Sequence, residues 1–329
     1  MEGWTQKNYS DFPALGLIGS RAMRKPGVPP GRTVSRLIEY NKSTFSAYFV
    51  FATWGTYLDA LRPRSDARSP AKNRITKNVR LLEGYNPTLK WAARWSWLEG
   101  YVLRPGKLGG IVEMAELLEL SAPKADQVRT LIFLTDPSDL EEAYPEDRAL
   151  IRGAIRNNVT LLPTYRSAEL WAAYESERAT TSAGRSADAK VSKSDPKQEA
   201  LALIAHDGKK LEMCRWVVAH RDKIRQFDKI ITTGTTGDWI GQFLLAVGIP
   251  QRRIELIGRK ASGPKGGDVE IAGAVLRGCC HHVVFFVDPM TSHPHEADIQ
   301  TLLRTCTMPD VNVNLRLTEQ AATSWIGTV

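Results

Sequence analysis

Cysteine is scarce in this chain, and its arrangement argues against two kinds of architecture. Only four cysteines occur in 329 residues: Cys214, Cys279, Cys280 and Cys306. No C-x-x-C pair is followed by a second such pair, so neither a structural zinc site nor a disulfide framework is expected. Free thiols fit a reducing compartment, which favours the cytoplasm.

Long apolar runs are also missing. No stretch reaches the roughly 18 apolar residues that a membrane-spanning helix needs. The opening residues, MEGWTQKNYSDF, lack the apolar centre of a secretion signal. We therefore expect a cytoplasmic protein without a membrane partner. At roughly 100–200 residues per domain, the length predicts two domains.

Positive charge is in excess but unevenly placed. The formal net charge is +8, and seven basic residues stand between Arg62 and Arg80 against one acid, Asp66. Our interpretation is a solvated loop. Binding to nucleic acid is the alternative, but no zinc-finger spacing and no RNA-recognition motif supports it.

The sequence falls into two similar units around a polar stretch. Residues 176–197 are rich in Ser, Ala and Lys and lack large apolar side chains, which predicts a flexible linker between residues 1–175 and 198–329. Three pairs of segments match across it in the same order: LGLIGS with LALIAH, GGIVEMAELL with GGDVEIAGAVL, and TLIFLTDP with HVVFFVDP. An apolar-apolar-Arg triplet then follows in each unit, ending at Arg152 and Arg304. These matches predict a tandem duplication.

Short apolar runs alternate with helical patterns in the second unit. Strands are expected in 200–207, 228–237, 281–289 and 311–317, and helices in 209–224, from near Asp238, 268–278, 297–306 and 318–326. Such alternation indicates a parallel sheet covered on both faces. We predict an α/β protein of two tandem Rossmann-like, three-layer units, with ligands at the carboxyl ends of the strands.

Two glycine-bearing turns and two polar clusters fall at those ends. TTGTTG (232–237) and SGPKGGD (262–268) each precede a helix and could present N–H groups to a phosphate, although a plain turn and a helix-capping Asp268 are alternatives. His206-Asp207 is followed by Lys209 and Lys210. Asp288 is followed by His293, His295 and Asp298, where acid–base chemistry is favoured over metal because the spacing matches no standard zinc pattern.

Taken together and in this order, LIAHD…K, TGTTG, SGPxGGD and FFxDP…PHxxDI…LLR resemble the methylglyoxal synthase family over residues 198–329. The resemblance implies a carbon–oxygen lyase that converts dihydroxyacetone phosphate to methylglyoxal and inorganic phosphate. It also implies a cytoplasmic homo-oligomer that uses no metal and no cofactor. The alternative is a non-catalytic sensor or binding module for a phosphorylated metabolite or nucleotide.

The resemblance also implies a role for each site residue. Asp268 would be the general base and His295 would polarise the carbonyl. Asp298 and Asp207 would support the hydrogen-bond network, with His206 beside them as a substrate-binding residue, and Asp288 would orient the site. The residues that would hold the phosphate are Lys210, Thr233, Thr235, Thr236, Gly237, Ser262 and Gly263. Arg316 and Lys265 depart from the family pattern, so Arg316 could add a phosphate contact or alter the substrate.

The first unit, residues 1–175, lacks these groups and contains no histidine. Ile111 stands in the place of Asp268, Ala143 in that of His295 and Glu146 in that of Asp298. Ser20 and Arg21 replace His206 and Asp207, and Thr53–Thr56 is only a weak echo of TGTTG. We expect a degenerate, catalytically dead repeat that replaces a neighbouring subunit or senses an effector. Its insert carries Trp91, Trp95, Trp97 and Tyr101, which we expect to pack in a core or interface, with a ligand site as the alternative.

Overall fold

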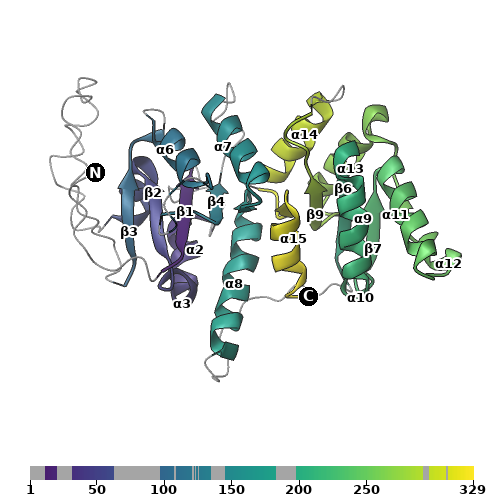
Figure 1. Ribbon diagram of the computed structural model, residues 1–329, viewed down its shortest axis with the longest axis horizontal. Helices are drawn as coiled ribbons and strands as arrows, with labels where there is room; N and C mark the ends of the chain where they lie inside the picture. The colour runs from purple at the N-terminus through teal and green to yellow at the C-terminus, as the bar shows by residue number, and fades with distance from the viewer. Residues whose placement is uncertain are drawn as a thin grey trace.

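The computed structural model describes residues 12–20, 32–62, 97–106, 109–120, 122, 124, 126–134, 145–182, 198–291, 296–308 and 310–329. Within these ranges the chain forms two five-stranded sheets whose strand pairs are all parallel. The sheets lie side by side with their edge strands β5 and β10 in contact, and helices α8 and α15 lie at the boundary between them (Figure 1). The predicted α/β class is confirmed.

The two sheets have the same strand order. The first runs β3-β2-β1-β4-β5 and the second, read in the same direction, β8-β7-β6-β9-β10. In the register, Leu15 pairs with Thr130 and Leu201 pairs with His282, and these are the residues that the sequence match equates. The strands are β1 (Ala14–Gly19), β2 (Phe49–Thr53), β3 (Glu99–Leu103), β4 (Thr130–Leu134), β5 (Thr160–Leu162), β6 (Ala200–Ala205), β7 (Lys229–Thr232), β8 (Gly258–Arg259), β9 (His282–Phe286) and β10 (Asn314–Arg316).

Helices cover both sheets. Those of the first unit are α2 (Val34–Tyr40), α3 (Lys42–Phe45), α4 (Trp54–Thr56) with its continuation η2 (Tyr57–Leu61), α6 (Gly110–Leu117), α7 (Pro145–Arg156) and α8 (Tyr165–Ser182). Those of the second are η7 (Asp207–Lys209), α9 (Lys210–Ala219), α10 (Arg221–Ile224), α11 (Gly234–Ala246), α12 (Gln251–Ile254), η8 (Gly263–Lys265), α13 (Gly267–Leu276), α14 (Glu296–Thr307) and α15 (Glu319–Ile326). None of the described helices combines the length and apolarity needed to cross a membrane.

Two helix boundaries differ from those expected. Helix α11 begins at Gly234 rather than near Asp238, because Thr233 is extended and the chain turns helical directly after it. The GTTG segment is therefore the first turn of the helix and not a loop before it. Helix α8 continues to Ser182, through the first residues of the predicted linker, where Glu and Arg are good helix formers. Residues 183–197 lie outside the described ranges.

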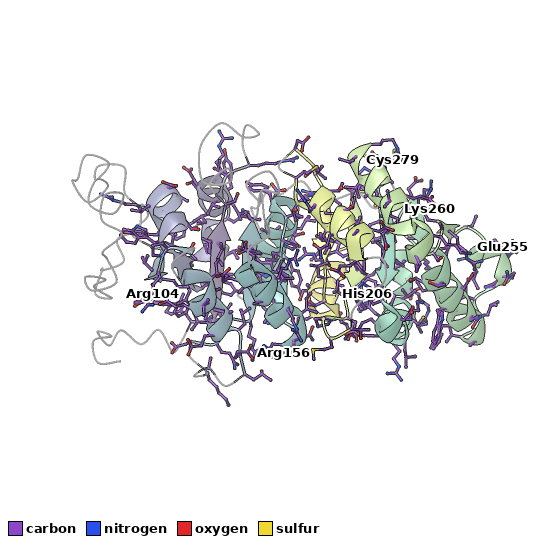
Figure 2. The ribbon with its side chains drawn as sticks, turned by 90° about the horizontal axis from the view of Figure 1, so that it is seen from above. Arg104, Arg156, His206, Glu255, Lys260 and Cys279 are labelled. Carbon is purple, nitrogen blue, oxygen red and sulfur yellow. The ribbon has the colours of Figure 1, made fainter. Side chains whose placement is uncertain are left out.

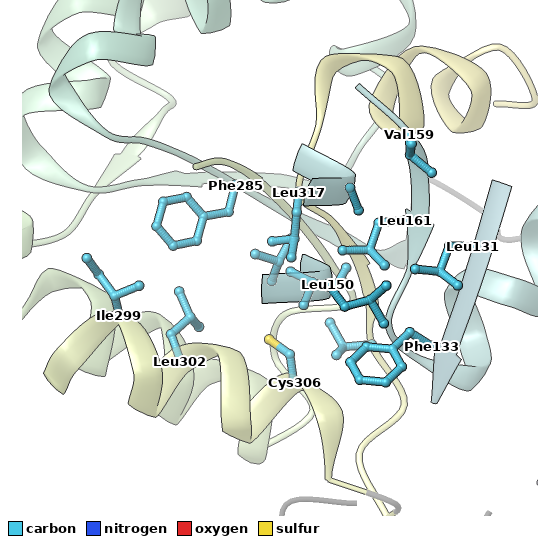
Figure 3. Close-up of a cluster of buried hydrophobic side chains, with 14 of the residues drawn as sticks. Leu131, Phe133, Leu150, Val159, Leu161, Phe285, Ile299, Leu302, Cys306 and Leu317 are labelled. Carbon is cyan, nitrogen blue, oxygen red and sulfur yellow. The ribbon is translucent and has the colours of Figure 1, made fainter. Parts of the chain in front are cut away.

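One hydrophobic core extends through both units. It occupies the face of the sheets covered by α6, α7, α13 and α14, and joins Leu150 and Leu161 of the first unit to Phe285 and Leu302 of the second (Figure 3). A separate cluster lies on the opposite face of each sheet. The shared core makes the two units one packed body on this face.

The contact between the units is nearly symmetric. Thr164 Oγ1 donates to the Val313 carbonyl oxygen at 2.8 Å, and Thr318 Oγ1 donates to the Val159 carbonyl oxygen at 3.3 Å. Thr164 and Thr318 hold equivalent places, directly before α8 and α15. The bonds are therefore reciprocal, as across the two-fold axis of a homodimer. The Ser167 hydroxyl also exchanges hydrogen bonds of 2.9 Å with Leu315 on the edge of β10.

Candidate functional site

Four segments meet at the carboxyl edge of the second sheet, where parallel sheets bind their ligands. The Nδ1 atom of His206, after β6, accepts a hydrogen bond from the Asp288 N–H, after β9, at 2.9 Å. The turn after β7 is tied to the segment after β8, because the Gly234 N–H donates to the Ala261 carbonyl oxygen at 3.0 Å. The structure thus brings together the segments that carry the predicted site residues of the described chain.

The first glycine turn is a compact helix start. Thr233 Oγ1 donates to Thr236 Oγ1 at 3.0 Å, and both side chains are buried, whereas Thr235 is exposed. A Cβ at Gly237 would collide with Thr232 Oγ1, so only glycine fits there. The first N–H groups of a helix have no partner within it, which leaves the start of α11 able to bind an anion.

The second glycine turn carries the predicted base. Gly266 has φ +88°, and a Cβ at Gly267 would collide with the Ala261 carbonyl oxygen, so this turn requires both glycines. Asp268 is the second residue of α13 and only 2% exposed. The helix-capping position belongs to Gly266, so the alternative that Asp268 is a cap is wrong. Ser262 is half-buried and extended at the entrance to this turn, and Gly263 is buried.

Asp288 holds the turn that follows β9. Its carboxylate accepts from the Met290 N–H at 3.0 Å and from Thr291 Oγ1 at 2.8 Å. Gly208 packs against this carboxylate closely enough that a Cβ there would lie 2.7 Å from Asp288 Oδ2. His206 is buried beside it, edge-on to Phe285. Asp288 therefore fixes the shape of this turn, and its orienting role stays a prediction.

The remaining predicted site residues differ in their burial, and two of them lie outside the described chain. Lys210 is buried and forms an ion pair with Asp207, whose side chain is 92% exposed. Asp298 is half-buried in the first turn of α14. His293 and His295 lie outside the described residues. Among those that are described, no three His, Cys, Asp or Glu side chains gather in a way that could hold a metal ion.

Two cations at this edge were not anticipated from the sequence. Arg259 packs against Gly237 and Gly241 and lies 3.4 Å from Asp238, and Lys260 (Figure 2) lies 3.3 Å from Glu270. Both precede the SGP motif and lie beside the start of α11. The adjacent basic pair Arg259-Lys260, one residue before the SGP turn, is the sequence signal that could have identified them.

The first unit keeps this backbone arrangement but carries Ile111 in the place of Asp268. Thr53 Oγ1 lies 3.0 Å from Thr56 Oγ1, as in the second unit, and Gly109 has φ +101°. The Trp54 N–H donates to the Arg104 carbonyl oxygen at 3.3 Å, like Gly234 to Ala261. Ile111, in the place of Asp268, is buried in the shared core. The turn at Thr53–Thr56 therefore resembles TGTTG more closely in structure than in sequence.

The structure describes only some of the other first-unit residues that the sequence singled out. Ser20 repeats a backbone bond of His206, since its N–H donates to Leu134 as that of His206 donates to Phe286. Glu146 lies in the first turn of α7. Outside the described residues lie Arg21, Ala143, Trp91, Trp95 and most of the basic stretch.

Arg316 is bonded to the first unit. Its guanidinium is 1% exposed, and Nη2 donates to the Ser167 carbonyl oxygen at 3.1 Å. Nε and Nη1 have no hydrogen-bond partner in the described part of the chain. Burial lowers the pKa of Arg316 to about 9. A buried group held in this way is poorly placed to grip a phosphate at the glycine turns. Lys265, the other departure from the family pattern, is exposed.

A second ionisable cluster lies at the opposite, amino end of the sheet. His282 is buried between Glu199, 2.8 Å from its Nε2, and Asn314, 3.1 Å from its Nδ1, and stacks on Trp325. Burial lowers the pKa of His282 despite the nearby Glu199. Burial by itself raises the pKa of the Glu199 carboxyl. The hydrogen bond with His282 acts in the opposite direction, and the pKa of Glu199 lies below its usual value. This pair belongs to the frame of the second unit, far from the glycine turns.

Comparison with known proteins gives a consistent assignment. No protein-family profile matches the chain. A methylglyoxal synthase from Thermus thermophilus is 40% identical over 129 residues, which is 39% of this chain and 94% of that protein. One from Cupriavidus metallidurans is 41% identical over 111 residues, 34% of this chain and 72% of that protein. The solved methylglyoxal synthase from Elizabethkingia anophelis is 31% identical, covering 40% of this chain and 78% of its own, with a TM-score of 0.33. Through this third of its length, the chain belongs to the methylglyoxal synthase family.

Proposed function

We propose that the second unit, residues 198–329, is a carbon–oxygen lyase that converts dihydroxyacetone phosphate to methylglyoxal and inorganic phosphate. The observation that carries the proposal is the buried Asp268 on a glycine turn that is bonded, through Gly234 and Ala261, to a second turn suited to phosphate. The similarity to methylglyoxal synthases over 94% of one relative supports it.

In the proposed reaction, Asp268 removes a proton from the carbon that carries the substrate's hydroxyl group. The electron pair moves to the carbonyl oxygen and forms an enediol, which donors near the edge of the sheet stabilise. The bond between carbon and the phosphate oxygen then breaks, inorganic phosphate leaves, and the remaining enol rearranges to methylglyoxal. His295 is proposed to polarise the carbonyl.

The phosphate is proposed to bind at the start of α11 and at Ser262–Gly263. Because phosphate leaves as an already charged group, this part of the site needs mainly to hold it. Lys210, which pairs with Asp207, and Arg259, which packs against Gly237 and pairs with Asp238, are proposed to supply positive charge to the phosphate. We further propose that residues 1–175 are not catalytic and that the chain acts as a cytoplasmic homo-oligomer.

The test is turnover by the purified full-length chain. Dihydroxyacetone phosphate should yield equal amounts of methylglyoxal and inorganic phosphate with a chelator present. Asp268→Asn should abolish turnover and keep phosphate binding. Asp222→Asn, the same change at an exposed carboxylate of α10, is the matched control and should keep full activity. Unchanged turnover in Asp268→Asn would refute the assigned base.

A second candidate function is binding without turnover. It is favoured by the first unit, which keeps the threonine pair and the glycine turn but carries Ile111 in place of the acid. A sensor for a phosphorylated metabolite or nucleotide would be stabilised thermally by its ligand and release no phosphate. The turnover assay separates the two functions.

A further inference from the structure

Helix α7 of the first unit reaches the proposed catalytic edge of the second. Arg152 Nη2 lies 3.5 Å from Met290 Sδ. Met290 belongs to the turn whose shape Asp288 fixes, because its N–H donates to Asp288 Oδ1. A cationic side chain from one unit therefore stands next to a loop that carries a proposed site residue of the other.

A pocket between the units extends the same contact. Its volume is about 210 Å³, and its lining includes Arg156 and Asn158 of the first unit and Lys209, Val287 and two acids, Glu212 and Glu319, of the second. Lys209 lies between Asp207 and Lys210, and Val287 directly precedes Asp288. Arg156, labelled in Figure 2, closes α7 at this boundary.

The arginines of α7 form one face of the helix. Arg148, Arg152 and Arg156 are spaced by four residues, which places them on the same side, and all three are exposed. Arg156 is paired with Glu119. Among the described residues, neither Arg148 nor Arg152 forms an ion pair, whereas Glu146 and Asp147 stand in the first turn of the same helix.

We propose that this arginine face is a device for attracting the substrate: Arg148 and Arg152 raise the positive potential at the mouth of the second unit's site and draw in a dianionic phosphate monoester. The inference rests on the proposed function and gives the non-catalytic unit a task within it. The two arginines touch no reacting atom, so they act on the encounter with substrate and not on the chemical step.

The test is the dependence of kcat/KM on ionic strength. Charges more than about 10 Å apart are screened at 0.1 M salt, so the attraction of the substrate by the two arginines should be measurable only at low ionic strength. For the double variant Arg148→Gln/Arg152→Gln we expect a kcat/KM reduced about three- to ten-fold at low ionic strength, equal to wild type at high ionic strength, with kcat unchanged. Arg148→Lys/Arg152→Lys keeps the charge and should keep the rate.

The matched control removes the same charge from the opposite end of the sheet. Arg221 and Arg225 flank α10, which precedes β7 at the amino edge. Arg221→Gln/Arg225→Gln should leave the salt dependence as in wild type. If the α7 variant behaves like wild type at every salt concentration, or the α10 variant loses as much, the inference is overturned while the lyase proposal stands.

A failure of the proposed function would look different. The wild-type chain would then release no phosphate from dihydroxyacetone phosphate at any salt concentration. The arginine face is in that case tested by the affinity for inorganic phosphate, measured by calorimetry. Weaker binding by Arg148→Gln/Arg152→Gln at low salt would support the attraction, and equal binding would overturn it.

Discussion

Replacing Arg316 by leucine should stabilise the protein. The equivalent residue of the first unit, also third in its strand, is the fully buried Leu162, so the fold accepts leucine at this position. The guanidinium of Arg316 is buried with one hydrogen bond, to the Ser167 carbonyl oxygen, and with Nε and Nη1 unpartnered in the described chain. Removing a charge with so few partners from water destabilises the folded state by more than its one hydrogen bond stabilises it.

The magnitude follows from the pKa. Burial lowers the pKa of Arg316 to about 9, well below its usual value. At 1.36 kcal/mol per pKa unit, a lowering of this size corresponds to a free energy on the order of 5 kcal/mol against the charged form. Losing the charged hydrogen bond to Ser167 lowers the stability of the variant by about 1.5–3 kcal/mol, which offsets part of this gain. Arg316→Leu should therefore raise the free energy of unfolding by about 2–3 kcal/mol at pH 7.

The pH dependence gives a second check. Because the pKa is lower in the folded state, the unfolded chain binds more protons above pH 9, and wild-type stability gains from this group as the pH rises from there towards the usual arginine pKa. The full penalty is present below pH 9, so the advantage of the leucine variant should be constant from pH 7 to 8 and shrink above pH 9.

Urea unfolding, followed by circular dichroism at several pH values, measures both effects. Arg225→Leu, at an exposed arginine, serves as the control and should change stability little. A leucine variant of Arg316 that is less stable than wild type at pH 7 would refute the reasoning, because it would mean that the buried cation is needed by partners or a ligand.

Three further outcomes are expected. Stability should fall as the pH drops below 6.5, because the lowered pKa of His282 makes the unfolded chain bind more protons there; the fall, read from urea midpoints, should be smaller in His282→Gln. Gly267→Ala should cut kcat/KM by about 100-fold, since the collision with the Ala261 carbonyl displaces the turn that carries Asp268. Ile111→Asp should cost about 3 kcal/mol of stability by burying a charge in the core, and the turnover per chain should not rise.

Much of the fold could be predicted from the sequence because the signals are local. Apolar runs closed by Asp-Pro marked β4 and β9, and the repeated order of motifs predicted two equivalent units. The start of α11 could not be predicted in the same way. Glycine and threonine favour a turn, but the bond from the Gly234 N–H to Ala261 and the close packing of Gly237 set the helix start instead.

The candidate site was predictable at the level of segments and not of side chains. Strands of one parallel sheet end at one edge, which is why the segments near 206, 234, 262 and 288 meet. The exposure of Asp207 and the burial of Arg316 depend on neighbours distant in sequence. Ser167, which holds Arg316, is 149 residues away from it, and no local pattern reports such a contact.

The reciprocal bonds of Thr164 and Thr318 have an evolutionary consequence. In a dimer of identical chains, every substitution appears on both sides of the axis, so a change that ruins one active centre ruins its twin. Covalent fusion removes that constraint, because each half can vary alone while their partnership stays fixed at one to one. Isoleucine at position 111 opposite aspartate at 268, and leucine at 162 opposite arginine at 316, are asymmetries that a dimer of one identical chain could not carry.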